Sequence, residues 1–383
     1  MPFGNKPKLI NKADTVVRIL FDHSVFSLQS RGGISRYFCE LVGHLLDCHD
    51  CSPHILAPLH MSHLLKESPG LPVTGKYMAR RTGTHRLRQL INNLCSSFML
   101  RACKPDIIHG TYYLARMHRP AATPYVMTVF DMIHERFADQ LVAGEESIAK
   151  EKKRCMQQAD QVICISEHTR KDVVELAGIS EEKTTVVHLG CSFSCLKSSR
   201  REKPLFSSPY LLYVGTRGKI KNFNRALRAY AQSEKLSSDL SLLCFGGGSF
   251  TSEELLLAKD LGLSSGRLVH FSGDDQMLAN IYRNAAAMIY PSLYEGFGLP
   301  ILEAMACDCP VLCSNTSSMP EVAGRAALLF DPCSENELTA CMEQVVYSAS
   351  TRERLVNAGR RRITQFSWRR CAEETVKVYN RCL

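Results

Sequence analysis

Glu295 and Glu303 stand eight residues apart around a glycine-rich stretch, Gly296-Phe297-Gly298-Leu299-Pro300. The apolar run before it, residues 286–290, has the length of a buried strand, and a proline suits the first turn of the helix expected next. Free N–H groups at a helix start bind anions, and glycines let the backbone come close to a ligand. A carboxylate accepts two hydroxyl hydrogen bonds, so each glutamate suits a vicinal diol. The pattern predicts a phosphate held between two diols, as in a nucleotide sugar. A plain strand-turn-helix with two surface glutamates is the alternative.

A cationic loop follows a second apolar run, residues 210–215, and contains Arg217, Lys219 and Lys221. Arginine offers phosphate a planar fork and lysine a mobile point charge, so the loop could neutralise a pyrophosphate without a metal. A solvated basic loop explains the same residues equally well. No Asp-x-Asp cluster of metal-binding carboxylates accompanies the loop, and we expect no metal and no cofactor beyond the nucleotide sugar itself.

Polar side chains also follow two strands expected in the first half of the chain. His109 and Tyr112 follow residues 106–108, and Asp131 and His134 follow residues 124–130. Ligands of doubly wound sheets gather outside the carboxyl ends of the strands, so we expect His109, Asp131 and His134 to lie where a ligand binds. Surface or capped histidines are the alternative. Gly32-Gly33 precedes a helical apolar pattern over residues 34–46 and suggests backbone near phosphate, for which a structural turn is the simpler explanation.

Taken together, these motifs resemble the retaining glycosyltransferases of family 4. The resemblance rests on Glu-x7-Glu with its embedded Gly-Phe-Gly-Leu-Pro, on residues 32–37 (Gly-Gly-Ile-Ser-Arg-Tyr) and on Lys221, and it extends from about Val16 to Tyr379. It implies an α/β protein of the GT-B fold, with two doubly wound Rossmann-like domains facing a central cleft. Two departures matter: Phe130 stands where the family usually has His, and Arg217 lies one residue later than the common Arg.

The resemblance also implies a role for each candidate residue. Glu295 would hold the donor sugar and Glu303 the ribose, while Arg217 and Lys221 would stabilise the leaving pyrophosphate. Asp131 and His134 complete the predicted catalytic set, and His109 and Tyr112 are acceptor-side candidates. The predicted donor-binding set is Gly32, Gly33, Gly273, Gly296, Phe297, Gly298, Leu299 and Glu303.

Length and composition fit two ordinary globular domains. The chain has 383 residues, 45% of them hydrophobic and 22% charged, with a net charge of +9 that by itself favours no particular anionic partner. We expect an N-terminal acceptor-side domain over 1–200 with a disordered leader at 1–14, a nucleotide-sugar domain over 205–365, and a final helix, 366–383, that crosses back to the first domain. Seventeen cysteines, mostly within apolar runs, and no signal sequence favour a reducing, cytoplasmic location. Metal binding at the lone pair Cys48 and Cys51 is the weaker alternative.

A basic segment, residues 66–104, holds eight cations and one acid. Within it Leu87, Leu90, Ile91, Leu94 and Phe98 have helical spacing, so a cationic helix with an apolar stripe is expected. Such a helix can lie on an anionic membrane at its inner face, and a core-packed helix with a solvated basic side is the alternative.

The sequence therefore predicts transfer of a hexose, mannose or rhamnose by analogy with enzymes that build lipopolysaccharide and other surface polysaccharides, from a nucleotide diphosphate sugar to a glycan or lipid-linked acceptor. A GT-B-type phosphorylase or epimerase is one rival. A non-catalytic glycan- or nucleotide-sugar-binding protein is another. The aromatic and basic residues are not interleaved as a nucleic-acid surface requires, so nucleic acid is not an expected partner.

Overall fold

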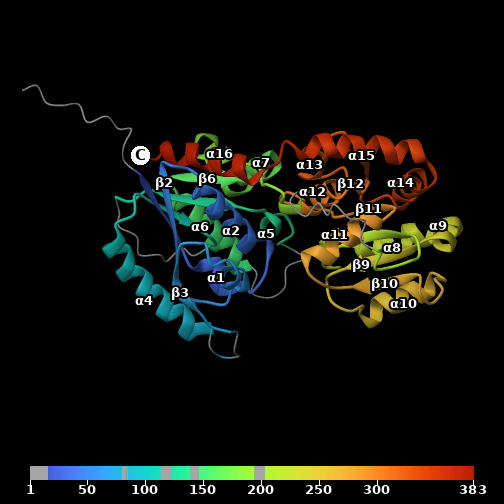
Figure 1. Cartoon of the computed structure of the whole chain (residues 1–383), viewed down its shortest axis with the longest axis horizontal. Helices are drawn as coiled ribbons and strands as arrows, with labels where there is room; N and C mark the ends of the chain where they lie inside the picture. Colours follow the sequence, from blue (N-terminus) through green and yellow to red (C-terminus); the bar gives the residue numbers. More distant parts are fainter. Residues whose placement is uncertain (1–15, 80–82, 84, 114–121, 139–145, 194–202) are drawn as a thin grey trace, which may run out of the picture. The chain divides into compact units, whose positions relative to one another are not determined.

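The computed structural model describes the chain except for residues 1–15, 80–82, 84, 114–121, 139–145 and 194–202 (Figure 1). The predicted leader at 1–14 therefore lies outside the described residues. The chain forms two compact units. The described residues of the first come from 1–128, 150–163 and 372–383, and those of the second from 129–149 and 164–371.

The first sheet has seven strands in the order β3-β2-β1-β4-β5-β6-β7. Short buried apolar runs form its centre, where β1 pairs in parallel with β2 and with β4 (Val17 opposite Cys51, Ile19 opposite Ile107). The strand order reverses between β1 and β4, which is the switch point of a doubly wound sheet. The strands are β1 Val17–Phe21, β2 Cys51–His60, β3 Val73–Tyr77, β4 Ile107–Gly110, β5 Tyr125–Val129, β6 Gln161–Cys164 and β7 Thr184–Val186.

The second sheet has six strands in the order β10-β9-β8-β11-β12-β13, and every neighbouring pair is parallel. Its order reverses between β8 and β11. The strands are β8 Tyr210–Val214, β9 Ser241–Phe245, β10 Leu268–Phe271, β11 Ala287–Tyr290, β12 Val311–Ser314 and β13 Ala327–Phe330. The two sheets confirm the predicted pair of doubly wound α/β domains. All strands of the first sheet fall within 1–200 and those of the second within 205–365, although residues 129–149 and the described part of 164–200 group with the second unit.

Helices cover both sheets, as parallel strands require (Figure 1). In the second unit, Leu227 and Tyr230 of α8 and Met342 of α14 are buried against Leu211 and Ile289 of the central strands. The helices of the first half are α1 Ser24–Leu28, α2 Gly33–Leu45, α3 His63–Glu67, α4 His85–Cys103, α5 Ile133–Arg136, α6 Glu146–Gln158 and α7 Glu167–Ala177. Those of the second half are α8 Phe223–Gln232, α9 Glu234–Asp239, α10 Ser252–Asp260, α11 Asp275–Asn284, α12 Leu299–Ala306, α13 Met319–Ala323, α14 Glu335–Tyr347, α15 Ala349–Ile363 and α16 Trp368–Asn380.

The last helix returns to the first sheet. Tyr379 of α16 places its hydroxyl 2.6 Å from Nδ1 of His109 in β4, 270 residues earlier in the chain. Among the described residues, sixteen cysteines are free thiols and no group of three or more His, Cys, Asp or Glu side chains could hold a metal ion. Within that same part of the chain, none of the helices combines the length and the apolar character that crossing a bilayer demands.

Candidate active site

The centre of the site is an ion pair between two loops at one edge of the second sheet. β8 and β11 are neighbouring parallel strands, so the loops that follow them emerge together. Lys221, at the end of the 3₁₀ turn Lys219–Lys221, places its ammonium nitrogen 2.6 Å from Oε1 of Glu295, and Ser292 donates to the same oxygen at 2.6 Å. The carboxylate is nearly buried, whereas 30% of the lysine side chain is exposed. The structure thus joins the two predicted residues and leaves the lysine accessible to a ligand.

Hydroxyls from the loop after β12 hold the backbone of the Glu295 loop. The Glu295 N–H donates to Ser317 Oγ at 3.0 Å. Ser318 Oγ donates to the carbonyls of Glu295 and Phe297 at 2.9 and 3.0 Å. Neither serine was predicted from the sequence. Their signal was the polar run after the apolar residues 311–313, because β12 borders β11 and its loop must reach the same edge.

Two glycines of the motif serve different needs. A Cβ on Gly296 would lie 1.7 Å from the carbonyl oxygen of Phe130, so the protein's own backbone makes the close approach there. Gly298 has φ +101° as the N-cap of α12, a conformation that L side chains rarely adopt. The sequence prediction was that both glycines let the backbone approach a phosphate. The described contacts show that Gly296 is needed because the Phe130 carbonyl leaves no room for a side chain.

Asp131 is brought to this loop by the same contact. It follows β5, and a Cβ added to Gly296 would lie 3.1 Å from the Cβ of Asp131. Its Oδ1 accepts the Ile133 N–H at 3.1 Å, which fixes the side chain at the start of α5. His134, three residues on, has a buried Nδ1 with no hydrogen-bond partner among the described residues. Asp131 therefore lies beside the Glu295 loop, as the prediction of a shared site requires.

Glu303 lies in α12, and Tyr282 of α11 donates to its Oε2 at 3.2 Å. Burial, and then the charge of this carboxylate, raise the pKa of Tyr282, so the phenol remains a hydrogen-bond donor. No pattern in the sequence pointed to Tyr282. Of the other predicted donor residues, Gly273 lies between β10 and α11, and Leu299 is the first residue of α12. Phe297 is buried, with its ring centroid 5.8 Å from that of Phe366, so only its backbone remains for a donor.

Arg217 has a different set of contacts from those predicted. Its side chain is 4% exposed, and Nε donates to Glu254 at 2.8 Å. The remaining bonds go to the carbonyls of Gly246, Gly248 and Ser249. These contacts organise the turn after β9 and do not support direct binding of a pyrophosphate. Lys221 is the predicted cation whose contacts fit that role.

His109 is likewise a core residue. It has no exposed surface, and its ring nitrogens contact the hydroxyls of Tyr379 at 2.6 Å and Thr128 at 2.9 Å. Burial lowers the pKa of His109 to about 3, so the ring is neutral. Its contacts do not support the predicted role at an acceptor. Tyr112 is half-buried, with its ring centroid 4.4 Å from that of Tyr113.

The predicted glycines of the first unit, Gly32 and Gly33, form the N-cap and first residue of α2. Gly32 is extended, and a Cβ on Gly33 would meet no atom within 4 Å. Protein packing therefore does not require glycine at Gly33.

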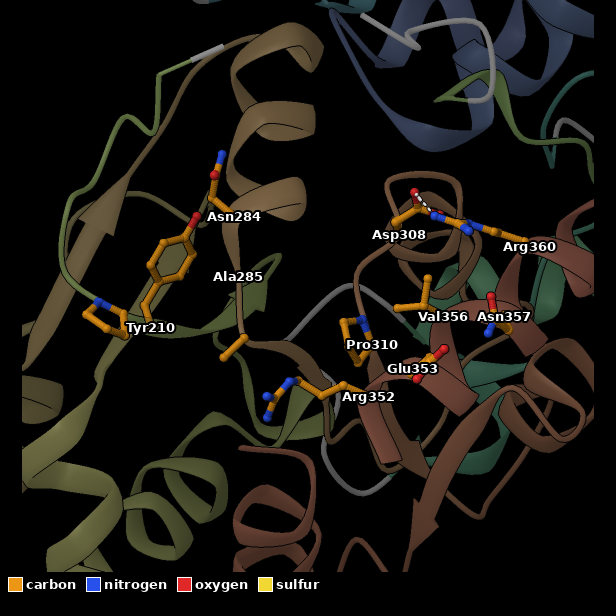
Figure 2. A pocket seen from close by; sticks show the side chains of 12 residues that line it. Tyr210, Asn284, Ala285, Asp308, Pro310, Arg352, Glu353, Val356, Asn357 and Arg360 are labelled. Carbon is orange, nitrogen blue, oxygen red and sulfur yellow. Dashed lines mark hydrogen bonds and ion pairs between the residues drawn. The ribbon is translucent and has the colours of Figure 1, made fainter. Parts of the chain in front are cut away.

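A depression of about 530 Å³ lies at the other edge of the second sheet, where β8, β11 and β12 begin (Figure 2). Tyr210, Asn284 and Arg352 line it, and Arg360 closes one side through a two-bond ion pair with Asp308 at 2.7 and 2.8 Å. None of the predicted site residues lines this depression.

Two family models match consecutive parts of the chain. The model for glycosyl transferases group 1 matches residues 197–362, and the model for Glycosyltransferase Family 4 matches residues 31–193. The chain belongs to the family 4 glycosyltransferases. This family 4 enzyme is 28% identical to an O-antigen chain mannosyltransferase B of Escherichia coli, over 91% of its own length and 95% of that protein.

Solved structures agree with this assignment at the level of the fold. The lipopolysaccharide glycosyltransferase WaaG is similar with a TM-score of 0.73 and 14% identity, over 95% of this chain and 99% of that one. Anabaena HepE, solved with UDP and glucose, has a TM-score of 0.72 and 15% identity over the same shares. These likenesses and the two parallel sheets confirm the GT-B fold.

Proposed function

We propose that this glycosyltransferase moves mannose, with rhamnose as the second choice, from a nucleotide diphosphate sugar to a hydroxyl of a growing glycan or lipid-linked acceptor, with retention of configuration. The observation that carries the proposal is the Lys221–Glu295 pair, a partly exposed cation held beside a carboxylate where β8 and β11 end. The E. coli relative, an O-antigen chain mannosyltransferase, supports mannose as the sugar and a polysaccharide as the acceptor.

The residues present can divide the work by charge. When the bond from the anomeric carbon to the phosphate oxygen breaks, negative charge grows on the pyrophosphate. Lys221 and the backbone N–H groups after Gly296 would stabilise it, which is preorganised electrostatic catalysis. Glu295 would accept hydrogen bonds from the sugar hydroxyls and Glu303 from the ribose. The acceptor oxygen would bond to the same face of the sugar while its proton passes to the departing phosphate. Lys221 supplies the charge, so we propose no divalent ion.

Nucleotide binding is tested by thermal shift with GDP, UDP, dTDP and ADP and their sugars. A ligand at about one hundred times its Kd stabilises the folded state by about 2.7 kcal/mol, or about 5–10 °C here. We expect one base to give this shift in the wild type and Glu303→Ala to lose it. Glu353→Ala, an exposed residue of α15 at the opposite edge of the sheet, is the matched control and should keep it.

Activity is tested by following the product with acceptor present and absent. NMR of the new anomeric centre should show the configuration of the donor, and EDTA should leave the rate unchanged. Recovery of an EDTA-inhibited rate by manganese would contradict the metal-independent step. Conversion of the donor without acceptor would favour the epimerase, and sugar phosphate formed from inorganic phosphate would favour the phosphorylase.

We also propose that α4 docks on an anionic membrane. Its four large apolar residues Leu87, Leu90, Leu94 and Phe98 are between 56% and 75% exposed. The alternative, a helix whose apolar stripe packs on the core, does not hold for these four side chains because they are largely exposed. Burying them in lipid would contribute about 5 kcal/mol, comparable to a single myristoyl chain and marginal by itself.

The inner face of α4 explains why the apolar stripe points outward. Asn92 donates to Ser27 Oγ at 2.8 Å and to the Leu59 carbonyl at 2.9 Å, and it accepts the Leu59 N–H at 2.8 Å. One turn further on, Ser96 bonds to Nδ1 of His23 at 3.1 Å. Arg88, Asn92 and Ser96 are all buried. Polar contacts thus fix the helix with its apolar face away from the sheet.

Charge complementarity favours anionic lipid as the partner. The segment 66–104 that contains α4 also holds Lys66, Lys76, Arg101 and Lys104, and its single acid is Glu67. Each basic residue near an anionic surface contributes about 1 kcal/mol. Flotation with vesicles of phosphatidylglycerol and phosphatidylcholine tests this. We expect Leu94→Glu/Phe98→Glu to stay at the bottom, and salt to weaken wild-type binding. Leu255→Glu/Leu256→Glu, at exposed leucines of α10, is the control. Equal flotation of the two double variants would refute the proposal.

A further inference from the structure

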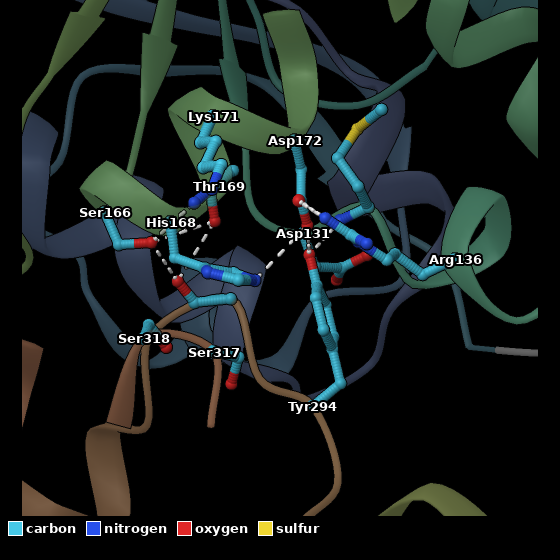
Figure 3. A network of polar contacts seen from close by, with 12 residues as sticks. Asp131, Arg136, Ser166, His168, Thr169, Lys171, Asp172, Tyr294, Ser317 and Ser318 are labelled. Carbon is cyan, nitrogen blue, oxygen red and sulfur yellow. Dashed lines mark hydrogen bonds and ion pairs between the residues drawn. The ribbon is translucent and has the colours of Figure 1, made fainter. Parts of the chain in front are cut away.

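A fully buried carboxylate, Asp172 of α7, lies beside Tyr294 of the Glu295 loop (Figure 3). Its Oδ2 accepts the hydroxyl of Tyr294 at 2.6 Å, and its Oδ1 accepts Nε of Arg136 at 3.1 Å and also Nη2. A charge is kept in such a place only when it is paired and hydrogen bonded, and this one is. The residue it holds immediately precedes Glu295.

The Tyr294 hydroxyl is used twice. Besides donating to Asp172, it accepts the backbone N–H of Met132 at 3.1 Å. Met132 directly follows Asp131. One phenol therefore ties together α7, the turn that carries Asp131 and the loop that carries Glu295.

The residue on the other side of Glu295 is attached to the same elements. The Gly296 carbonyl accepts Ser166 Oγ at 2.7 Å and Thr169 Oγ1 at 3.1 Å, both at the start of α7. Its Cα packs against the Phe130 carbonyl. Glu295 is thus bracketed by two anchored neighbours, while its own carboxylate turns to Lys221.

We propose that Asp172 and Tyr294 are positioning residues of the transfer reaction. Their hydrogen bond holds Glu295 and Asp131 in the relative positions that the reaction requires. The inference rests on the proposed function, and it assigns no contact with substrate to either residue. This hydrogen bond anchors the side chain of Tyr294, the residue before Glu295, to α7 outside the second sheet. Its loss should therefore let the carboxylate drift without removing any group that binds the donor.

Tyr294→Phe is the sharpest test because it deletes one oxygen and leaves Asp172 paired with Arg136. We expect kcat to fall about tenfold to a hundredfold, the effect of a small misplacement of a catalytic group. The KM for the donor should stay within about twofold. Asp172→Asn keeps an acceptor for the phenol and should retain more activity than Tyr294→Phe. The double variant should be no worse than the worse single variant, because both act through one hydrogen bond.

Tyr230→Phe is the matched control. Tyr230 is also fully buried in the second unit and gives one hydrogen bond, to the Leu240 carbonyl at 2.6 Å. It should lower the melting temperature by a similar amount and leave kcat unchanged. A fall in kcat for Tyr294→Phe no larger than that for Tyr230→Phe overturns the inference, as does a loss expressed only in KM.

Wild-type turnover and the nucleotide shift are measured first, so the two proposals fail separately. A wild type without transfer refutes the proposed function. A wild type that transfers mannose beside an equally active Tyr294→Phe variant refutes only the positioning role.

Discussion

His109 should make the folded protein sensitive to mild acid. Burial lowers its pKa to about 3, from 6.5 for an ordinary histidine. Between these values the unfolded chain binds a proton that the folded chain does not. The stability that the folded protein gains by keeping His109 neutral is therefore complete above pH 6.5 and is lost as the pH falls below that value. At about 1.36 kcal/mol per pH unit, lowering the pH from 7 to 5 removes about 2 kcal/mol.

The assay is thermal unfolding of the wild type and of His109→Gln at pH 7 and pH 5. Glutamine cannot titrate, whereas other histidines whose pKa is lowered by burial, such as the half-buried His54 and the buried His60, contribute equally to both proteins. The wild type should lose about 4–8 °C more than the variant on acidification. Equal losses would refute the reasoning, since they would mean that His109 is protonated in the folded state or becomes exposed before unfolding.

Three further outcomes follow from the site. Gly296→Ala should abolish transfer and destabilise the fold because its Cβ would overlap the Phe130 carbonyl, whereas Gly33→Ala should fold normally; circular dichroism and turnover separate the two. Lys221→Met should lower kcat by about a hundredfold or more in steady-state kinetics, as loss of a preorganised charge does, and should cost less stability than Arg217→Met because Ser292 still donates to Glu295. Arg217→Met should instead cost about 3 kcal/mol in urea unfolding, because it leaves a buried Glu254 and several carbonyls unpaired.

Apolar runs of strand length placed Lys221 and Glu295 in the loops after two strands, but their ion pair was not predicted. It depends on the parallel pairing of β8 with β11, which brings the two loops together. Arg217 and His109 were harder to interpret, because their partners lie 19 to 270 residues away and only the folded chain supplies them. Their residue types suggested chemistry, but their contacts indicate packing.

Helix α4 illustrates a different limit. Periodicity correctly grouped Leu87, Leu90, Leu94 and Phe98 on one side, but it cannot say which side turns inward. That choice depends on Asn92 and Ser96, whose partners belong to β2 and to residues 23–27. Gly296 shows the reverse case, in which the residue type was recognised while its physical reason was not.

The bond between His109 and Tyr379 also constrains the order of events during synthesis. The first unit needs residues 372–383, and its central histidine finds its partner 270 residues later in the chain. At about 5–20 residues per second, a ribosome needs roughly 14 to 54 seconds to cover that interval. During this time His109 of β4 lacks the hydroxyl of Tyr379, and we expect the first unit to complete its packing only after the second is made. A nascent chain stalled ahead of α16 should therefore protect the second sheet from protease while leaving the first open.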